Sequence, residues 1–254
     1  MPRTRNLLPA RTGPLPGQLD PSELIEAGGS MRARAISEIR ARMQTGELAS
    51  DNTFSELMIC EQLGMSRAPV REALIALSCG GWVEALPRAG WRVRALTLNE
   101  ARDLLAVRAA LAPAAAALAA RRAPHDQEAT DALQHYIDVE ERRAAPDTSV
   151  NQLIIDSYRC IRRIARLSGN LEFDRCLEDV LARLVRYYLL RPVSEAMQRH
   201  PISLVPVIQS VLDGDADAAR DRMAAYASAD QHRLTEAIID SELIQSVRLA
   251  SSPR

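Results

Sequence analysis

The segment that most limits how this chain can fold runs from Gly64 to Leu77, GMSRAPVREALIAL. Ser66 is a suitable helix N-cap, because its hydroxyl can accept a backbone N–H of the first turn. Pro69 falls within that turn, where a missing N–H costs little. Three apolar residues follow at helical spacing and form one stripe: Val70, Leu74 and Leu77. The segment therefore predicts a turn followed by an amphipathic helix.

Two arginines on this helix point to a nucleic-acid partner. Arg67 and Arg71 are four residues apart and share a helix face near the N-terminus. Arginine can bond bidentately to guanine in the DNA major groove, and a helix N-terminus favours phosphate. The alternative is a solvated amphipathic helix that binds nothing, so the flanking segments decide between the two interpretations.

The upstream flank predicts two more helices. Residues 32–44 place apolar side chains on one face, and Gly46 follows as a C-cap. Ser55 then precedes a short helix over residues 56–63 that ends at Gly64. A helix, a tight turn with glycine and a second helix form the helix-turn-helix pattern, in which the second helix reads the DNA.

The downstream flank predicts a basic hairpin. Residues 82–86 and 91–95 alternate as strands do, and Pro87-Arg88-Ala89-Gly90 joins them. The hairpin carries three arginines within reach of the DNA backbone or the minor groove: Arg88, Arg92 and Arg94. Three helices followed by such a hairpin predict a winged helix-turn-helix.

The run SRAPVREAL at residues 66–74, followed by GGWVE at 80–84 and the Pro-Arg-Ala-Gly hairpin, resembles the GntR family of transcriptional regulators. The resemblance implies that Arg67 and Arg71 contact bases and phosphates, and that Gly90 lies at the tip of the wing. The chain departs from the family pattern where Ala68 replaces the usual threonine, where Ser50-Asp51 replaces a Pro-Gly pair, and where Thr53 replaces an arginine. These departures bear on phosphate contacts rather than on the fold.

Composition and charge limit the rest of the chain. Its 254 residues are 47% hydrophobic but only 4% aromatic, which favours helices over sheet in a second domain. The net charge of −1 would not by itself identify a DNA-binding protein. The sequence shows no signal peptide and no uncharged stretch of membrane-spanning length, so we expect a cytoplasmic protein without a membrane partner. The four scattered cysteines predict neither disulfides nor a zinc site.

The second half reads as an all-helical domain. One long Ala-rich helix is predicted from Leu98 to about Arg122, and apolar-periodic stretches follow at about 126–144, 148–167, 171–190, 194–212 and 215–245. This layout resembles the FCD effector domain of FadR-like GntR regulators, on the Val107-Arg108 run, Ser168-Gly169-Asn170 and the segment Gly214–Met223. We therefore predict a mainly α protein with four parts: a basic Pro-rich arm (1–29), a winged helix-turn-helix (30–96), a helical effector-binding and dimerisation domain (97–245) and a tail (246–254).

The resemblance also implies a metal site that this chain lacks. Many FCD domains bind a divalent metal with one aspartate and three histidines, and the metal anchors a carboxylate effector. The corresponding positions carry residues that are not strong ligands: Ser157, Ile161, Leu204 and Tyr226. Asp156 lies one residue away from its slot, while His200 and His232 lie four and six residues away from theirs. We predict no bound metal and no cofactor, with a relocated metal site as the alternative.

A metal-free cavity then becomes the candidate sensor. Ile161, Leu204 and Tyr226 would make its centre apolar with one hydroxyl, and Ser157 and Arg108 are candidate polar contacts. Such a lining suits a relatively apolar small molecule. The alternative is a filled helical core that binds no ligand.

The sequence carries no enzyme signature: it lacks a Gly-x-Ser-x-Gly, a P-loop, a Rossmann fingerprint and a His-Glu-x-x-His motif. The prediction is a homodimeric regulator, a repressor, that binds a palindromic double-stranded DNA operator and responds to an effector in the helical domain. The DNA-binding residues are predicted to be Ser66, Arg67, Pro69, Arg71, Arg88, Gly90 and Arg92. A helical interaction protein with a degenerate reader is the remaining alternative, against which the intact arginine pair argues.

Overall fold

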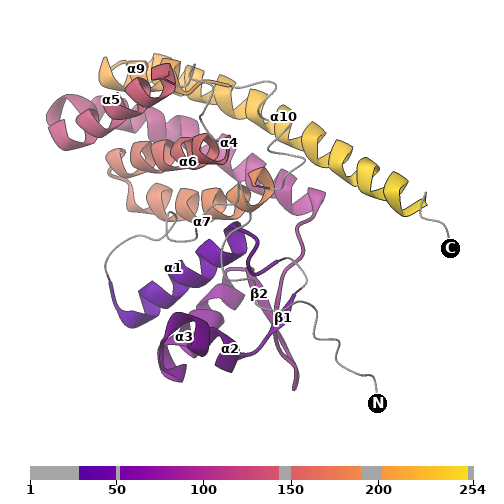
Figure 1. The fold of residues 1–254 in the computed structure, drawn as a ribbon. Helices are drawn as coiled ribbons and strands as arrows, with labels where there is room; N and C mark the ends of the chain where they lie inside the picture. Colours follow the sequence, from indigo (N-terminus) through magenta and orange to yellow (C-terminus); the bar gives the residue numbers. More distant parts are fainter. Residues whose placement is uncertain (1–28, 50–51, 143–149, 190–201, 251–254) are drawn as a thin grey trace.

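The computed structural model describes residues 29–49, 52–142, 150–189 and 202–250. It places a winged helix-turn-helix, here called the reader domain, beneath a layered set of helices, here called the helical domain (Figure 1). The predicted mainly α fold is therefore confirmed. The predicted arm lies almost entirely outside the described residues. The last helix continues to Ala250, five residues past the predicted boundary at 245.

The reader domain contains three helices and a small sheet. The helices are α1 (Met31–Gln44), α2 (Glu56–Leu63) and α3 (Arg67–Cys79), and the strands are β1 (Thr53–Phe54), β2 (Val83–Leu86) and β3 (Gly90–Val93). The strands are antiparallel and lie in the order β1-β3-β2. The core of the domain is apolar, and its most completely buried large side chains are Ile39, Ile59, Leu74, Leu77 and Trp82.

The sequence explains where the reader helices begin and end. Ser30 and Ser55 cap α1 and α2 by accepting the N–H groups of Ala33 (3.2 Å) and Met58 (3.1 Å). Helix α2 ends at Gly64, which adopts the left-handed conformation at φ 61°. The predicted helices over residues 32–44 and 56–63 are confirmed within a residue.

The helical domain is built around one long helix, α4 (Leu98–Arg122), which a short 3-10 turn, η2 (Ala123–His125), extends. Five further helices are described: α5 (Gln127–Arg142), α6 (Val150–Leu167), α7 (Leu171–Tyr188), α9 (Val205–Leu212) and α10 (Ala216–Ala250). Figure 1 shows α10 running alongside α4, with α6 and α7 between them and the reader domain. Small alanine side chains on the buried face of α4 let the neighbouring helices approach closely.

Helix α4 is long and apolar. Together with η2, the segment Leu98–His125 is long and apolar enough to cross a membrane by length and composition, which the sequence analysis did not anticipate. Over half of its most apolar window, 56%, is buried inside the protein. Burial of this kind is typical of the central helix of a helical bundle, and the packing of α10 and α7 on α4 accounts for its composition.

Candidate nucleic-acid interface

Helix α3 separates its apolar and basic residues onto two faces. Val70, Leu74 and Leu77 are at most 1% exposed and hold the helix against the reader core. Arg67 and Arg71 lie on the exposed side. The side chain of Arg71 is 70% exposed, and its closest ion-pair contact is Glu56 at 4.0 Å. Two guanidinium groups therefore face solvent at the start of the helix that was predicted to read DNA.

Ser66 is the N-cap of α3 by position, but the predicted cap bond is absent: its hydroxyl accepts no N–H of the first turn. The reason is the residue three positions later. In α1, α2 and α4 the capping hydroxyl accepts the N–H of the third helical residue, as Thr97 does from Glu100 at 3.2 Å. In α3 that residue is Pro69, which has no N–H. The start of α3 thus keeps an uncommitted hydroxyl beside exposed arginines.

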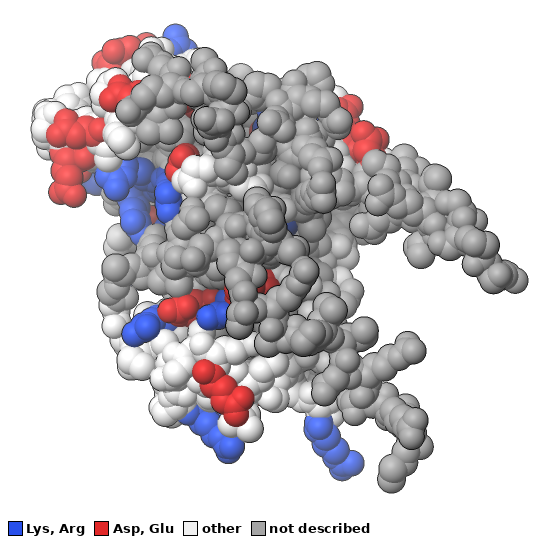
Figure 2. All heavy atoms as spheres, in the orientation of Figure 1, with Lys and Arg blue, Asp and Glu red and all other residues white. Residues whose placement is uncertain are grey.

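The wing presents Arg88 at its turn. Arg88 is exposed and adopts φ 62°, and it is the one non-glycine residue with a positive φ among those described. This conformation costs a non-glycine residue of order 1–3 kcal/mol, and such strain is concentrated at functional positions. Figure 2 shows basic side chains projecting from the end of the molecule that the reader domain forms.

The other two predicted wing residues, Gly90 and Arg92, lie on strand β3 of the wing. Arg92 stands opposite Glu84 across β2 and β3 and forms an ion pair with it, and both side chains are 43% exposed. Gly90 is the first residue of β3, beyond the tip, with φ 92°. A Cβ atom there would collide with the carbonyl oxygen of Phe54. Phe54 belongs to β1, a two-residue strand too short to be recognised from sequence, so Gly90 serves sheet pairing as well as the turn.

The helical domain gathers most of the predicted sensor residues. Ile161, Leu204 and Tyr226 belong to one buried cluster and are at most 8% exposed. Burial raises the pKa of the Tyr226 phenol, so the hydroxyl stays neutral. The hydroxyl of Ser157 lies 3.1 Å from that of Tyr136 on α5 and donates to the Leu153 carbonyl at 2.8 Å.

Arg108 is engaged by the protein itself. Its guanidinium lies 2.6 Å from the Asp230 carboxylate, with side-chain exposures of 3% and 2%, and it donates to the Tyr188 hydroxyl at 3.0 Å. Arg233 contacts the other Asp230 oxygen at 2.8 Å. Burial opposes ionisation of Asp230, yet Arg108 and Arg233 hold its pKa below the ordinary value. The network ties α4 to α7 and α10, a role that the sequence analysis did not foresee for Arg108.

Of the residues considered for a relocated metal site, Asp156 and His232 lie among the described residues and have other partners there. Among the described residues, no three histidine, cysteine or acidic side chains form a group that could hold a metal ion. His232 is 78% exposed on α10 and pairs with Glu236 at 3.1 Å. Asp156 accepts from Gln152 at 3.0 Å. His200 lies outside the described residues.

A pocket that the sequence analysis missed lies between α5 and α6. It has a volume of about 760 Å³, and its lining includes His135, Tyr136, Asp156 and Cys160. Burial raises the pKa of the Cys160 thiol and of the Tyr136 phenol, so both groups are neutral. Helices α5 and α6 contribute its walls, and the periodicity of either helix alone gives no signal of the space between them.

Helix α7 connects the two domains. The buried indole of Trp82 donates to Asp179 at 3.2 Å, and Arg40 reaches the same Asp179 oxygen at 3.2 Å. The Arg40 and Arg186 guanidinium groups lie 5.1 and 5.7 Å from the centre of the Trp82 ring. The side chain of Gln44 donates to the Ala182 carbonyl at 2.7 Å. These partners are about a hundred residues apart or more in the chain, so local sequence patterns could not predict their contacts.

Comparisons with known proteins match both domains. The family model described as "Bacterial regulatory proteins, gntR family" matches residues 31–93, and the FCD domain model matches residues 103–229. A "Probable D-xylose utilization operon transcriptional repressor" of Paenarthrobacter nicotinovorans is 27% identical over 216 residues, which cover 79% of this chain and 91% of that protein. An "Nta operon transcriptional regulator" of Aminobacter aminovorans is 26% identical over 191 residues, covering 74% and 84% of the two chains.

Solved structures show the same fold. McbR/YncC of E. coli superposes with a TM-score of 0.69 at 18% identity, covering 82% of this chain and 99% of that one. A putative GntR transcriptional regulator from Rhodococcus sp. RHA1 gives a TM-score of 0.55 at 18% identity, covering 80% and 96%. At these identities the likeness concerns the fold alone.

Proposed function

We propose, for a chain that belongs to the gntR family of bacterial regulatory proteins and carries an FCD domain, that it acts as a homodimeric transcriptional repressor in the cytoplasm. Membership of the family supports regulation through DNA binding. We propose in addition that the protein represses transcription, forms a homodimer, binds a palindromic operator and responds to an effector. The named relatives, an operon repressor and an operon regulator, support it. No enzymatic activity is expected of a protein of this family.

The observation that carries the proposal is the exposed start of α3. Arg67 and Arg71 project there without a close acidic partner among the described residues, since the Glu56 contact is 4.0 Å long. The Ser66 hydroxyl is not used as a cap. Major-groove readers place the N-terminal residues of the recognition helix against base edges. Arg67 and Arg71 would bond to guanine and phosphate, with Ser66 on the backbone and Arg88 on the flanking groove.

A two-fold dimer would present two such helices to one duplex. Half-sites separated by about one helical turn would then form a palindrome, because operator symmetry mirrors protein symmetry. An effector bound in the helical domain without a metal would change the spacing of the two readers and shift the population away from the DNA-binding form. The Ile161, Leu204 and Tyr226 cluster and the pocket lined by Tyr136 and Cys160 are the candidate regions for that effector.

The full chain is used to select the duplexes that it binds from a random DNA library. Sedimentation of the complex with a selected duplex then measures how many copies of the chain are bound. We expect a palindromic consensus bound by two copies. Arg71→Ala should relax the preference at the base that Arg71 reads, whereas Arg32→Ala, an exposed arginine on α1, should select the same consensus. Selection of duplexes without any common sequence would contradict the proposal.

Elemental analysis of the same preparation tests the metal-free part. We expect less than stoichiometric zinc, nickel or manganese after purification without chelator. A stoichiometric metal that is lost in His200→Ala or His232→Ala would establish a relocated site in place of the metal-free sensor.

A further inference from the structure

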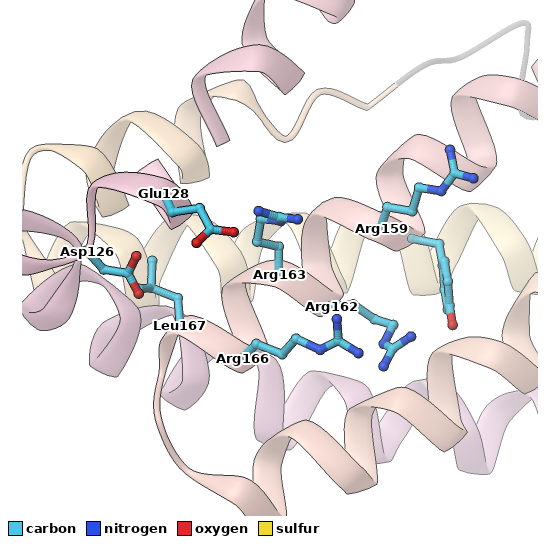
Figure 3. A pocket seen from close by; sticks show the side chains of 8 residues that line it. Asp126, Glu128, Arg159, Arg162, Arg163, Arg166 and Leu167 are labelled. Carbon is cyan, nitrogen blue, oxygen red and sulfur yellow. The ribbon is translucent and has the colours of Figure 1, made fainter. Parts of the chain in front are cut away.

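Four arginines of α6 line one open pocket on the outer side of the helical domain. Arg159 and Arg166 are each three and four residues from the adjacent pair Arg162 and Arg163, so the four side chains share one broad helix face. The pocket has a volume of about 460 Å³, within the range of small-molecule sites. Figure 3 shows the guanidinium groups distributed along α6, with Asp126 and Glu128 at one end. None of these arginines belongs to the predicted sensor.

Three of these arginines each contact a carboxylate near the pocket. Arg162 contacts Glu178 at 3.1 Å, while Arg166 contacts Asp174 at 3.7 Å and Arg159 contacts Asp156 at 3.4 Å. The last two distances exceed those of good charge-assisted hydrogen bonds, which are about 2.7–2.9 Å.

Arg163 differs from the other three. It is exposed, it lies at the edge of the arginine face on the side of Glu128 (Figure 3), and the part of the chain that the structure describes offers it no ion-pair or hydrogen-bond partner. Each guanidinium carries five donors in a fixed planar arrangement. The pocket therefore contains an excess of donors suited to carboxylate or phosphate oxygens.

We propose that this pocket binds a small molecule through one anionic group, a carboxylate or a phosphate, held by Arg163 together with Arg162 and Arg166. The Tyr158 ring, also in the lining, lies under the Arg162 guanidinium, 5.9 Å from the ring centre, and helps to position that group. Asp126 and Glu128 disfavour a second anionic group at their end of the pocket. The ligand class is thus a molecule with a single anionic end, bound on the face of α6 away from Ile161.

Occupancy of this pocket has a direct route to the reader domain. Glu178 contacts Arg162 through one carboxylate oxygen at 3.1 Å and Arg40 through the other at 3.5 Å. Arg40 lies on α1, and its guanidinium also covers the Trp82 ring. An anion bound to Arg162 competes with Glu178, so the ion pair that joins α7 to α1 changes when the pocket fills. This regulatory step rests on the proposed function, whereas the binding site itself does not.

The site is tested by calorimetric titration of the full chain with inorganic phosphate and, in a separate arm, with acetate, at constant ionic strength and without DNA. Saturable binding in either arm is expected, and the arm that binds identifies the anionic group. Arg163→Gln should weaken it about tenfold, the loss of one charge-assisted contact. Arg175→Gln, an exposed α7 arginine paired with Glu172, should bind like the parent chain. Absence of saturable binding in both arms, or equal binding by Arg163→Gln and the parent, would overturn the site.

The Glu178 route needs a second variant. Glu178→Gln removes the competing carboxylate, so the anion that binds the parent chain should bind several-fold more tightly if Arg162 belongs to the site. A role of Glu178 in packing alone predicts unchanged affinity, and that result would overturn the route. Both titrations are done without DNA, so they test the anion site separately from the proposed function. A chain that binds the anion but no DNA would contradict only the proposed function. A chain that binds DNA but no anion would contradict only the anion site.

Discussion

Two exposed arginines at the start of α3 and one buried arginine in the helical domain have opposite surroundings. Arg67 and Arg71 stand on the solvent face of α3, and the nearest carboxylate to Arg71 is 4.0 Å away. Arg108 is 3% exposed and bound to Asp230 at 2.6 Å. The same side chain is thus exposed and weakly paired where we propose DNA recognition, and buried with its charge matched where it supports the fold. Mutations should separate the two uses, because one should change DNA binding and the other stability.

The largest expected effect is on the core side of this comparison. Asp230→Ala leaves Arg108 buried without its carboxylate, and removing one partner of a buried pair costs about 3–5 kcal/mol. Urea unfolding monitored by circular dichroism measures the loss of unfolding free energy. The matched control is Glu236→Ala, which removes an exposed pair with His232 on the same helix and should cost no more than about 0.5 kcal/mol. Equal losses of unfolding free energy in Asp230→Ala and Glu236→Ala would show that the buried pair contributes no more to stability than the exposed one.

The pH dependence of unfolding sharpens the same point. Despite burial, Arg108 and Arg233 hold the pKa of Asp230 below its unfolded value. The stabilisation is therefore complete above the unfolded pKa, about 4, and is lost as the pH falls below it through the folded pKa. Between about pH 5 and about pH 3 the parent chain should lose more unfolding free energy than Asp230→Asn, which has no proton to gain. Parallel pH profiles of the two chains would contradict the assignment.

The smallest effect is expected at the wing. Arg88→Ala should weaken binding to all duplexes alike and lower the salt dependence of the affinity by about one unit, as the loss of a phosphate contact does. Arg88→Gly provides the control, because glycine adopts φ 62° without strain and removes only the side chain. Fluorescence anisotropy at several salt concentrations should give the same loss for both variants. If Arg88→Gly binds like the parent chain, the charge of Arg88 makes no contact.

The two regions also differ in how far the sequence predicts them. The faces of α3 follow from helical periodicity within thirteen residues, so the buried stripe and the exposed arginines could be predicted. The prediction of a Ser66 cap was wrong, because Pro69 at the third helical position has no N–H for the Ser66 hydroxyl to accept. The Arg108–Asp230 pair could not be predicted, because its partners are far apart in the chain and only the packing of α10 on α4 brings them together.

The sequence could not predict two further features: a very short strand and the pockets that form between helices. Strand β1 has two residues, too few for an alternating pattern. Because β1 could not be predicted, the close approach of Gly90 to Phe54 could not be predicted either. The pockets between helices, including the arginine-lined pocket on α6, depend on which helix faces meet. Sequence spacing placed four arginines on one face of α6 but gave no indication that a hollow lies beside them.

We propose that α3 reads DNA with arginines that the fold does not need. The measurement that tests it most directly is the affinity of Arg67→Ala/Arg71→Ala for a selected duplex, taken together with its unfolding free energy. We predict an affinity loss of about 100-fold or more, since each bidentate contact contributes about 1–3 kcal/mol, and an unfolding free energy within about 0.5 kcal/mol of the parent chain. Unchanged duplex affinity in this stable variant would contradict the account.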